Sequence, residues 1–280
     1  MSTKFKLTRK LLTPLASTAL ALSLLTHVPT ASATEIDDLK LEEIIDSNTD
    51  SATNIIEEEW ISHDGTIEFD SISNSTGPEL RNAQAPLQNE EITTKVIERE
   101  DGYQLVTVSE GAEALDLSFE FADSFLEELP SGHILVRPSE GEEPTAYIDP
   151  AWAQDADGNH IDTRFSIEGD TLVQHIAPSP VGTHVVSDPY IRDVRKNGRK
   201  IGQELVFTRD ETSIISLSGL PACIRLAAKG GPVSTAIGTI GCGGALLIAS
   251  HANNTGRCLT LRAIGSPYAP NLIFPYATSC

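Results

Sequence analysis

Apolar and polar residues alternate along the middle of the chain, as they do in strands with one buried face. The clearest stretch is Leu115–Phe121, in which every second residue is apolar. Shorter runs of similar character occupy residues 96–97, 103–108, 134–136, 146–148, 164–167 and 171–176. Tight turns are predicted at Asp101-Gly102 and Gly169-Asp170, each between two such runs. The pattern therefore predicts a mainly antiparallel β domain over residues 92–188.

A basic β-hairpin connector is predicted over residues 189–210. Asn197-Gly198 suits a type I′ turn, and the apolar residues around it are expected on paired strands. These apolar residues are Ile191, Val194, Leu205 and Phe207. We interpret the adjacent bases as a solvated turn, with a proteolytic processing site as the alternative; they are Arg195, Lys196, Arg199 and Lys200.

From residue 211 the pattern becomes that of helices. Two apolar stretches, 214–228 and 233–251, are separated by Gly230-Gly231-Pro232, a sequence that ends helices. Pro221 is expected to open the first helix, and residues 256–280 predict two short strands or extended arms. The expected fold class is α+β, an antiparallel β domain followed by a disulfide-stapled helical hairpin over residues 211–280.

The first 33 residues have the parts of a secretory signal peptide. Four bases precede an apolar core at Leu15–Leu25, and Ala31-Ser32-Ala33 fits a cleavage site. The core is about half as long as a bilayer-spanning helix, which disfavours the alternative of an uncleaved membrane anchor. We expect cleavage between Ala33 and Thr34 and a secreted protein, extracellular or associated with the envelope.

Residues 34–91 are predicted to form an acidic, partly disordered segment. Leu39, Leu41, Ile44 and Ile45 are compatible with one short helix or with disorder. Residues 73–91 are rich in Ser, Asn, Gln, Pro and Glu and lack apolar periodicity, so a loop or linker is expected there.

Charge divides the chain sharply. Residues 34–190 contain 36 acidic and 6 basic residues, whereas residues 191–280 contain 4 acidic and 10 basic residues. The strongly acidic balance disfavours nonspecific nucleic-acid binding, because phosphates would be repelled. Residues 191–280 are the part expected to contact a cell envelope or membrane surface, and no other partner is predicted.

All four cysteines lie in the last quarter of the chain, at Cys223, Cys242, Cys258 and Cys280. An even number in an exported chain predicts disulfides, and no C-x-x-C pair suggests zinc. We prefer the pairs Cys223–Cys242 and Cys258–Cys280, although the sequence alone allows three pairings. No cofactor or metal is predicted.

Three motifs carry a resemblance to a known group of proteins. They are Pro150–Asn159, then Thr171–His175, then Val185–Pro189. They resemble the "PWA-x-DANG", "GNTLVQ-x-V" and "VVADP" motifs of uncharacterised secreted actinobacterial proteins, with Asp157 and Asp170 in place of Asn and Ser187 in place of Ala. The similarity covers residues 103–280, including the cysteine-containing tail. It implies export and a two-part design, and it implies no activity.

Candidate chemistry is sparse. Asp155, Asp157 and Asn159 alternate as calcium ligands do, but an EF-hand loop would need Gly and Glu where His160 and Ser166 stand, so we interpret a polar turn. The motifs G-x-S-x-G, Ser-x-x-Lys and H-E-x-x-H are absent after residue 33. The histidines there are interpreted as structural: His63, His133, His160, His175, His184 and His251. We therefore expect no enzyme, with an unrecognised hydrolase as the alternative.

Residues 230–256 contain no Asp, Glu, Lys or Arg, and several glycines lie along the expected second helix. They are Gly238, Gly241, Gly243 and Gly244, followed by Ala245. Each glycine costs about 1 kcal/mol of helix stability relative to Ala, so packing is expected to offset it. We prefer a helix pressed against its hairpin partner to a membrane-active helix.

The leading function hypothesis is a secreted, non-enzymatic envelope or extracellular protein. One alternative is the precursor of a cationic, membrane-active antibacterial peptide or toxin, released from the C-terminal region by cleavage near Arg195-Lys196 or Arg199-Lys200. A second alternative is an adhesion or ligand-binding module formed by residues 92–188.

Overall fold

The computed structural model describes most of the chain after residue 37. The described residues are 38–48, 55–63, 66–68, 80–84, 92–99, 101–111, 113–180, 183–196, 199–219, 221, 231–266 and 269–280. The expected signal peptide, its cleavage site at Ala33 and Thr34, and Cys223 lie outside these residues. The predicted antiparallel β character is confirmed, since every strand pair among these residues is antiparallel.

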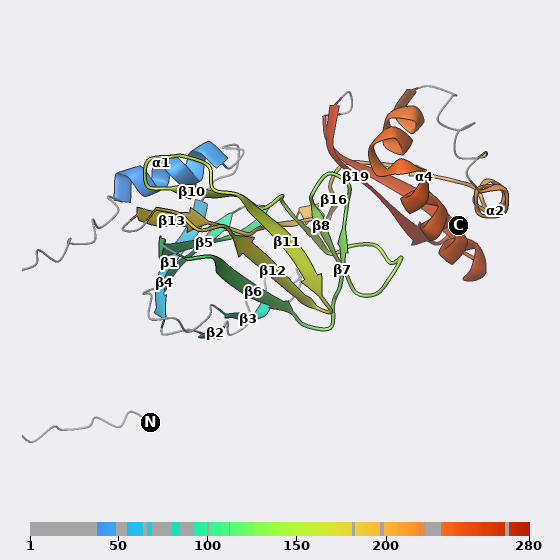
Figure 1. Cartoon of the computed structure of the whole chain (residues 1–280). Coiled ribbons are helices and arrows are strands. Elements are labelled where there is room, and N and C mark those ends of the chain that lie inside the picture. Colours follow the sequence, from blue (N-terminus) through green and yellow to red (C-terminus); the bar gives the residue numbers. More distant parts are fainter. Residues whose placement is uncertain are drawn as a thin grey trace, which may run out of the picture. The chain divides into compact units, whose positions relative to one another are not determined.

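Two sheets pack face to face (Figure 1). The larger has the order β1 (Ile55–His63), β4 (Ile92–Arg99), β5 (Gly102–Gly111), β14 (Tyr190–Asp193), β9 (Ala146–Ile148), β8 (Ile134–Arg137), β7 (Phe125–Glu128). Beside this path, β13 (Thr183–Ser187) pairs with β5 and with β10 (Ala153–Asp155). The second has the order β11 (Thr163–Glu168), β12 (Thr171–Ile176), β6 (Leu115–Phe121), β3 (Leu80–Gln84), β2 (Thr66–Glu68).

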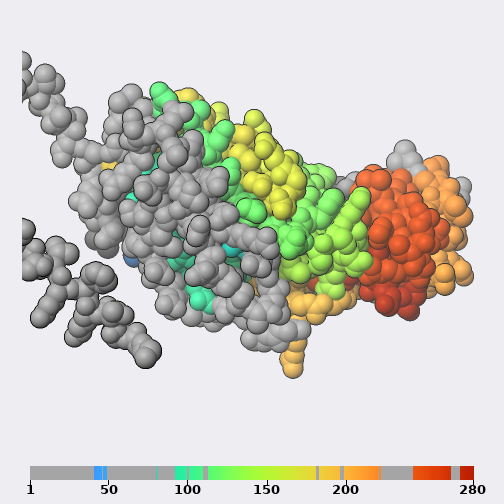
Figure 2. Space-filling model, turned by 90° about the horizontal axis from the view of Figure 1, so that it is seen from below, coloured from blue at the N-terminus to red at the C-terminus, as the bar shows by residue number. Residues whose placement is uncertain are grey.

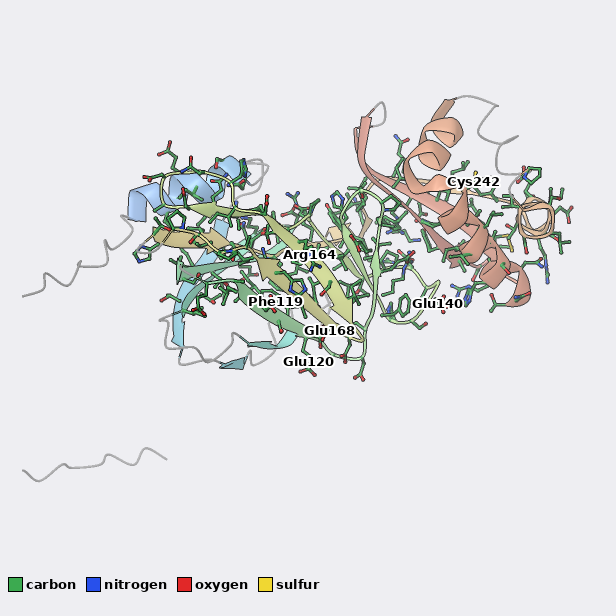
Figure 3. All side chains as sticks on the ribbon, in the orientation of Figure 1. Phe119, Glu120, Glu140, Arg164, Glu168 and Cys242 are labelled. Atoms are coloured by element: carbon green, nitrogen blue, oxygen red, sulfur yellow. A yellow bond between two sulfur atoms is a disulfide. The ribbon has the colours of Figure 1, made fainter. Side chains whose placement is uncertain are left out.

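The main core lies between these two sheets, and it follows from the alternation along each strand. On β6 the predicted apolar face is buried, with Leu117 and Phe119 at 4% and 1% exposure. These side chains share a cluster with Leu105 of β5 and Ile134 of β8 on the larger sheet. Figure 3 labels Phe119 and its neighbour Glu120, which belong to opposite faces of β6.

Helix α1 (Asp38–Asn48) covers part of the outer face of the larger sheet. Leu41, Ile44 and Ile45 lie at helical spacing and are buried against apolar residues that include Val106 and Val186. Of the two alternatives for this segment, the short helix is the one observed, and Figure 1 shows it beside β10 and β13.

The C-terminal part is built on a three-stranded sheet of β17 (Gln203–Val206), β18 (Cys258–Ser266) and β19 (Ala269–Thr278). Helices α2 (Arg209–Ser218) and α4 (Gly231–Asn254) pack on one face of it. The cluster there joins Phe207, Ile215, Ile248 and Leu259 with further apolar residues. Within the described residues, no helix has both the length and the apolar character that a membrane crossing requires.

The opposite face of this C-terminal sheet packs on the larger sheet. Phe274 and Tyr276 of β19 share an apolar cluster with Leu135 of β8 and Tyr147 of β9. Alternation explains the arrangement, because Ile134 and Val136 face the main core while Leu135 faces β19. The hairpin β18–β19 therefore lies between the helices and the β-sheets.

Three sequence expectations differ from the structure. Strands β1, β2 and β3 lie in the segment that was expected to be acidic and partly disordered. Their sequences alternate only weakly between apolar and polar residues, so the strands could not be recognised without their partners β4 and β6. Residues 195–196 and 199–200 do form a short hairpin, β15–β16, but Ile191 belongs to β14 and Leu205 to β17, which pair with other strands.

The third difference concerns the C-terminal region. Helix α2 begins at Arg209 and ends at Ser218, whereas the first helix was expected over 214–228. The N-cap residue Thr208 accepts a hydrogen bond from the Glu211 backbone, and Glu211 returns one to the Thr208 backbone, so a capping box fixes the early start. The expected short arms form the long hairpin β18–β19.

Candidate functional site

Ser166, His175 and Asp116 form a chain of hydrogen bonds across three neighbouring strands. The Oγ atom of Ser166 lies 2.7 Å from Nε2 of His175. Nδ1 of His175 lies 2.7 Å from Oδ1 of Asp116. Because an ionised carboxylate only accepts, a neutral His175 carries its proton on Nδ1 and accepts the Ser166 hydroxyl proton at Nε2. We call these three residues the outer array.

Strand register places the outer array on the solvent side of the second sheet. His175 of β12 stands directly opposite Asp116 of β6 and Arg164 of β11. Ser166 is two residues beyond Arg164 and therefore points to the same face. Phe165, between Arg164 and Ser166, points to the opposite face of β11 and is buried in the main core. The positions are thus set by paired strands rather than by a loop.

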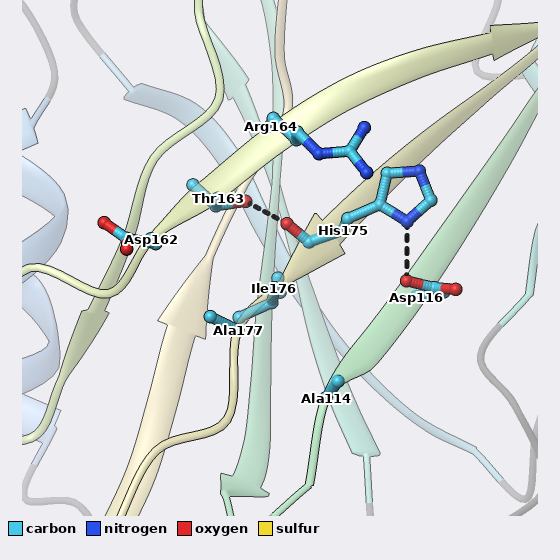
Figure 4. A pocket seen from close by; sticks show the side chains of 8 residues that line it. All are labelled: Ala114, Asp116, Asp162, Thr163, Arg164, His175, Ile176 and Ala177. Atoms are coloured by element: carbon cyan, nitrogen blue, oxygen red, sulfur yellow. Dashed lines mark hydrogen bonds and ion pairs between the residues drawn. The ribbon is translucent and has the colours of Figure 1, made fainter.

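A hollow of about 390 Å³ lies beside the outer array. Its lining consists of Ala114, Asp116, Asp162, Thr163, Arg164, His175, Ile176 and Ala177. Figure 4 shows Arg164 next to the imidazole and the bond between His175 and Asp116. Arg164 is exposed and makes no ion pair within the described part of the chain. Figure 2 shows residues around 150–175, in yellow-green and yellow, at the surface.

The outer array has the roles of an activated serine: a hydroxyl, a base that bonds it, and a carboxylate that orients the base. Its setting is open to water, since the side chains of His175 and Asp116 are 28% and 60% exposed. The backbone N–H groups of β12 point along the sheet toward its neighbours β11 and β6, and not toward the hollow. Arg164 is thus the only permanently cationic group in the lining that could meet negative charge.

A second cluster joins the C-terminal sheet to the β domain, and we call it the junction. Its centre is Arg262 of β18, whose side chain is fully buried. The Nη2 atom of Arg262 lies 2.5 Å from Glu143 and 2.5 Å from Glu204. It also donates to the Tyr276 hydroxyl at 3.0 Å, and Lys200 lies 3.2 Å from Glu143. The junction therefore pairs bases of the C-terminal part with an acid of the β domain.

Two further arginines link the same regions. Arg137 of β8 is fully buried, pairs with Glu127 at 2.7 Å, and donates to the Pro275 carbonyl of β19 at 2.8 Å. Arg257 pairs with Glu142, which adjoins Glu143 in the loop after β8. Glu140, labelled in Figure 3, belongs to this acidic loop. A buried arginine needs such partners, because an unpaired charge there would be costly.

The junction shifts the ionisation of its acids. Burial alone would raise the pKa of Glu204, but hydrogen bonds from Tyr276, Arg262 and Lys200 lower it to about 2. For Glu143, burial is likewise outweighed by Arg262 and Lys200, and its pKa is lowered. Both carboxylates are thereby held in the charged form that the bases require.

Elsewhere, buried aspartates are shifted the other way. Burial and the nearby Asp101 raise the pKa of Asp193 to about 6. Burial and Asp149 raise the pKa of Asp188 well above its usual range, and hydrogen bonds from Trp152 offset only part of this rise. These groups lie on or beside β14, within the larger sheet, and their surroundings make ionisation less favourable than it is in water.

The described cysteines are disulfide-bonded, and the acidic turn at Asp155 is closed by hydrogen bonds. Cys258 and Cys280 form a disulfide, as preferred from the sequence, and Cys242 of α4 is also disulfide-bonded. Asp155 accepts hydrogen bonds from the backbone of Asp157 and Asn159, both at 2.9 Å, and from the Asn159 side chain. The carboxylate of Asp155 thus closes its own turn, and the described residues contain no group of metal-binding side chains.

Two glycines of α4, Gly243 and Gly244, do not follow the expectation of close packing. An added Cβ at Gly243 or Gly244 would meet no atom within 4 Å. The buried face of α4 is formed instead by Ala245, Ile248 and Ala249. Of the small residues described here, Ala245 packs in the cluster with α2, β18 and β19, whereas Gly243 and Gly244 do not contribute to it.

Two other histidines, His133 and His251, have neighbours outside the outer array. His133 contacts Ser131 and lies 3.7 Å from Asp149, and burial followed by Arg192 lowers its pKa. His251 of α4 approaches Gly141.

Sequence reasoning missed the outer array, although a two-residue turn at Gly169-Asp170 already sets Arg164 opposite His175 and Ser166 diagonal to it. Asp116, 59 positions from His175, gave no such signal.

Comparison with known proteins gives no relative for this chain. No family model matches it, and no curated protein and no solved structure matches it either.

Proposed function

We propose that the chain is an exported extracellular or envelope-associated protein that works as one intact body, with its acidic β domain bound to its basic C-terminal part. Export rests on the signal-like first 33 residues. The observation that carries the intact body is Arg262, buried between Glu143 of the β domain and Glu204 beside it. Membership of the secreted actinobacterial group stays a prediction.

The charge division of the sequence supports this proposal. Arg195, Lys200 and Arg262 all contact Glu143, and Arg257 contacts Glu142. Bases from the second half are therefore neutralised by acids from the first half at contact distance. Direct pairs of this kind, partly shielded from water, are screened by salt far less than distant charges.

Release of the C-terminal region as a cationic peptide is less well supported. Departure of β18 and β19 would expose Phe274, Leu272 and Leu135, which share one apolar cluster. It would also leave Arg137 without the Pro275 carbonyl. The separation would thus expose buried apolar area and remove one partner each from the buried side chains of Arg137 and Arg262, and both effects oppose it.

Within the C-terminal part we also propose the helical hairpin. Helices α2 and α4 share an apolar cluster through Ile215 and Ile248, and Cys242 is disulfide-bonded. A bridge between Cys223 and Cys242 would staple the segment that joins the two helices. Mass spectrometry of non-reduced peptides tests this, and a peptide linking Cys242 to Cys258 or Cys280 would contradict it.

A ligand-binding role for the β domain is the second candidate. The hollow beside the outer array favours it, because Asp162, Arg164 and His175 bring a carboxylate, a guanidinium and an imidazole to one concave surface. Such a site would orient a small polar molecule.

The intact body is tested by nicking it. Trypsin is applied briefly to the native chain so that it cuts in the exposed hairpin at Arg199 or Lys200, and the product is run on a sizing column without denaturant. The proposal predicts that both fragments elute together and separate only in denaturant. Fragments that separate in buffer would contradict it.

A further inference from the structure

We infer that the outer array is an acyl-transfer site, in which Ser166 attacks small carboxylic esters that carry no negative charge. This inference goes beyond the proposed function, and it favours the hydrolase alternative over the expectation that the chain is no enzyme. It rests on the arrangement of side chains on β6, β11 and β12, which belong to different parts of the sequence.

Ser166 has the base that a serine nucleophile needs. A serine hydroxyl is a poor nucleophile unless a base within hydrogen-bond reach removes its proton. His175 is such a base, at 2.7 Å from Ser166. Asp116 bonds the other ring nitrogen at 2.7 Å, which fixes the tautomer and stabilises the imidazolium formed during attack.

Ser118 provides a matched comparison on the same sheet face. Ser118 of β6 also faces outward and is half-buried, and both Ser118 and Ser166 stand opposite Val173 of β12 and diagonal to His175. Of these two serines, only Ser166 has an imidazole nitrogen bonded to its Oγ atom.

Charge develops on the substrate during the reaction. Attack turns the carbonyl oxygen into an oxyanion, which needs a cation or N–H donors close by. Arg164 lies two residues from Ser166 on the same face and opposite His175, and it lines the hollow. Its guanidinium makes no ion pair among the described residues, so it is available for this role.

The hollow is lined by His175, Asp116 and Arg164 and lies beside Ser166, which does not line it, and its charges set the substrate class. A volume of about 390 Å³ is within the range of small-molecule sites. Asp116 and Asp162 both line it, and the chain as a whole is strongly acidic with a formal charge of −20. Anionic esters would be repelled, whereas uncharged esters of short acids would not.

The chemistry balances with water as the only co-substrate. Ser166 Oγ bonds to the ester carbonyl carbon while His175 takes the hydroxyl proton. The carbon–oxygen bond to the alcohol then breaks, and the alcohol leaves with the proton from His175. Water, deprotonated by His175, attacks the acyl-serine, and breakage of the serine ester returns the proton to Ser166 and releases the carboxylic acid.

The test uses the full secreted chain with 4-nitrophenyl butyrate and a fluorophosphonate probe. We expect the probe to add once, at Ser166, as located by peptide mass spectrometry. Ser166→Ala should abolish labelling and lower the hydrolysis rate at least about 100-fold, in line with loss of an activated nucleophile. Ser118→Ala, the matched control, should retain both.

Two further variants separate catalysis from structure. Asp116→Asn should slow hydrolysis while leaving the fold intact by circular dichroism, and Arg164→Ala should lower kcat more than it raises KM. The inference is overturned if the probe leaves Ser166 unmodified, or if Ser166→Ala hydrolyses the ester as fast as the parent chain. The latter result would mean that a surface histidine hydrolyses the ester without Ser166.

Discussion

Glu143 and Arg262 lie 119 positions apart in the chain, yet their side chains meet at 2.5 Å. The first belongs to the acidic loop after β8, and the second is buried in β18 of the C-terminal sheet. At this pair, an acid of the β domain and a base of the C-terminal part, which carry charges of opposite sign along the sequence, come into contact. Tyr276 and Glu204 also accept hydrogen bonds from Arg262.

Removal of Arg262 should therefore destabilise the protein strongly. Arg262→Ala would leave Glu143 and Glu204 without their main partner, and breaking a buried pair typically costs about 3–5 kcal/mol. Because Lys200 still contacts both acids, we expect the free energy of unfolding in urea to fall by about 3 kcal/mol. Arg164→Ala, the loss of an exposed arginine, is the control, and an equal effect of the two variants would contradict the role of the junction.

Asp193 predicts a dependence of stability on pH. Its folded pKa of about 6 lies above the usual value of 3.8, so the folded state binds this proton more tightly than the unfolded state. The resulting stabilisation is present below about pH 4 and is lost as the pH rises through about 6. Asp193→Asn should thus be more stable than the parent chain at pH 8, by about 1–2 kcal/mol after allowance for partial exposure, and similar to it at pH 4.

The measurement for Asp193 is urea denaturation of both chains at several pH values. Asp162→Asn, at an exposed position, controls for the loss of one negative charge. A difference between Asp193→Asn and the parent chain that stays constant from pH 4 to pH 8 would show that burial and Asp101 do not act as described.

Helix α4 should gain stability from alanine. Gly243 is exposed and Gly244 is half-buried, and a Cβ at either site meets open space. Gly243→Ala should therefore raise the free energy of unfolding by about 0.5–1 kcal/mol, because alanine restricts the unfolded chain and favours helix. Thermal unfolding checks this, and a fall in Tm would indicate that the glycine contacts a partner.

The Cys258–Cys280 disulfide should contribute stability through the unfolded state. It joins residues 22 positions apart at the end of the β18–β19 hairpin, and a loop of this size corresponds to about 3 kcal/mol in the chain-entropy model. Cys280→Ser changes the exposed partner and leaves Cys258 buried. A loss below about 1 kcal/mol would mean that the hairpin holds the terminus without the bridge.

Local features of this fold were readable from the sequence, and long-range ones were not. The alternation in Leu115–Phe121 and the turn at Gly169-Asp170 are local, and both predictions are confirmed. Strand β1 has three consecutive glutamates, so only its partner β4 reveals it. Helix α2 was placed too late because apolar spacing outweighed the capping box at Thr208 and Glu211.

The same contrast holds for the two sites. Ser166 and His175 belong to one hairpin, so their closeness follows from its turn. Asp116 joins them only through the pairing of β6 with β12. Glu143 and Arg262 are further apart still, and the sequence showed their opposite charges without showing that they meet. The Cys258–Cys280 pair was a preference among three pairings, and the structure contains it.

The most direct test of the account is intact mass spectrometry of the native secreted protein without reduction. We predict one species that begins at Thr34 and ends at Cys280, lighter than the reduced chain by the hydrogens lost from four bonded cysteines. That mass would join export, the disulfides and retention of the C-terminal part in one observation. A separate basic fragment ending at Cys280, or a chain that keeps its first 33 residues, would contradict it.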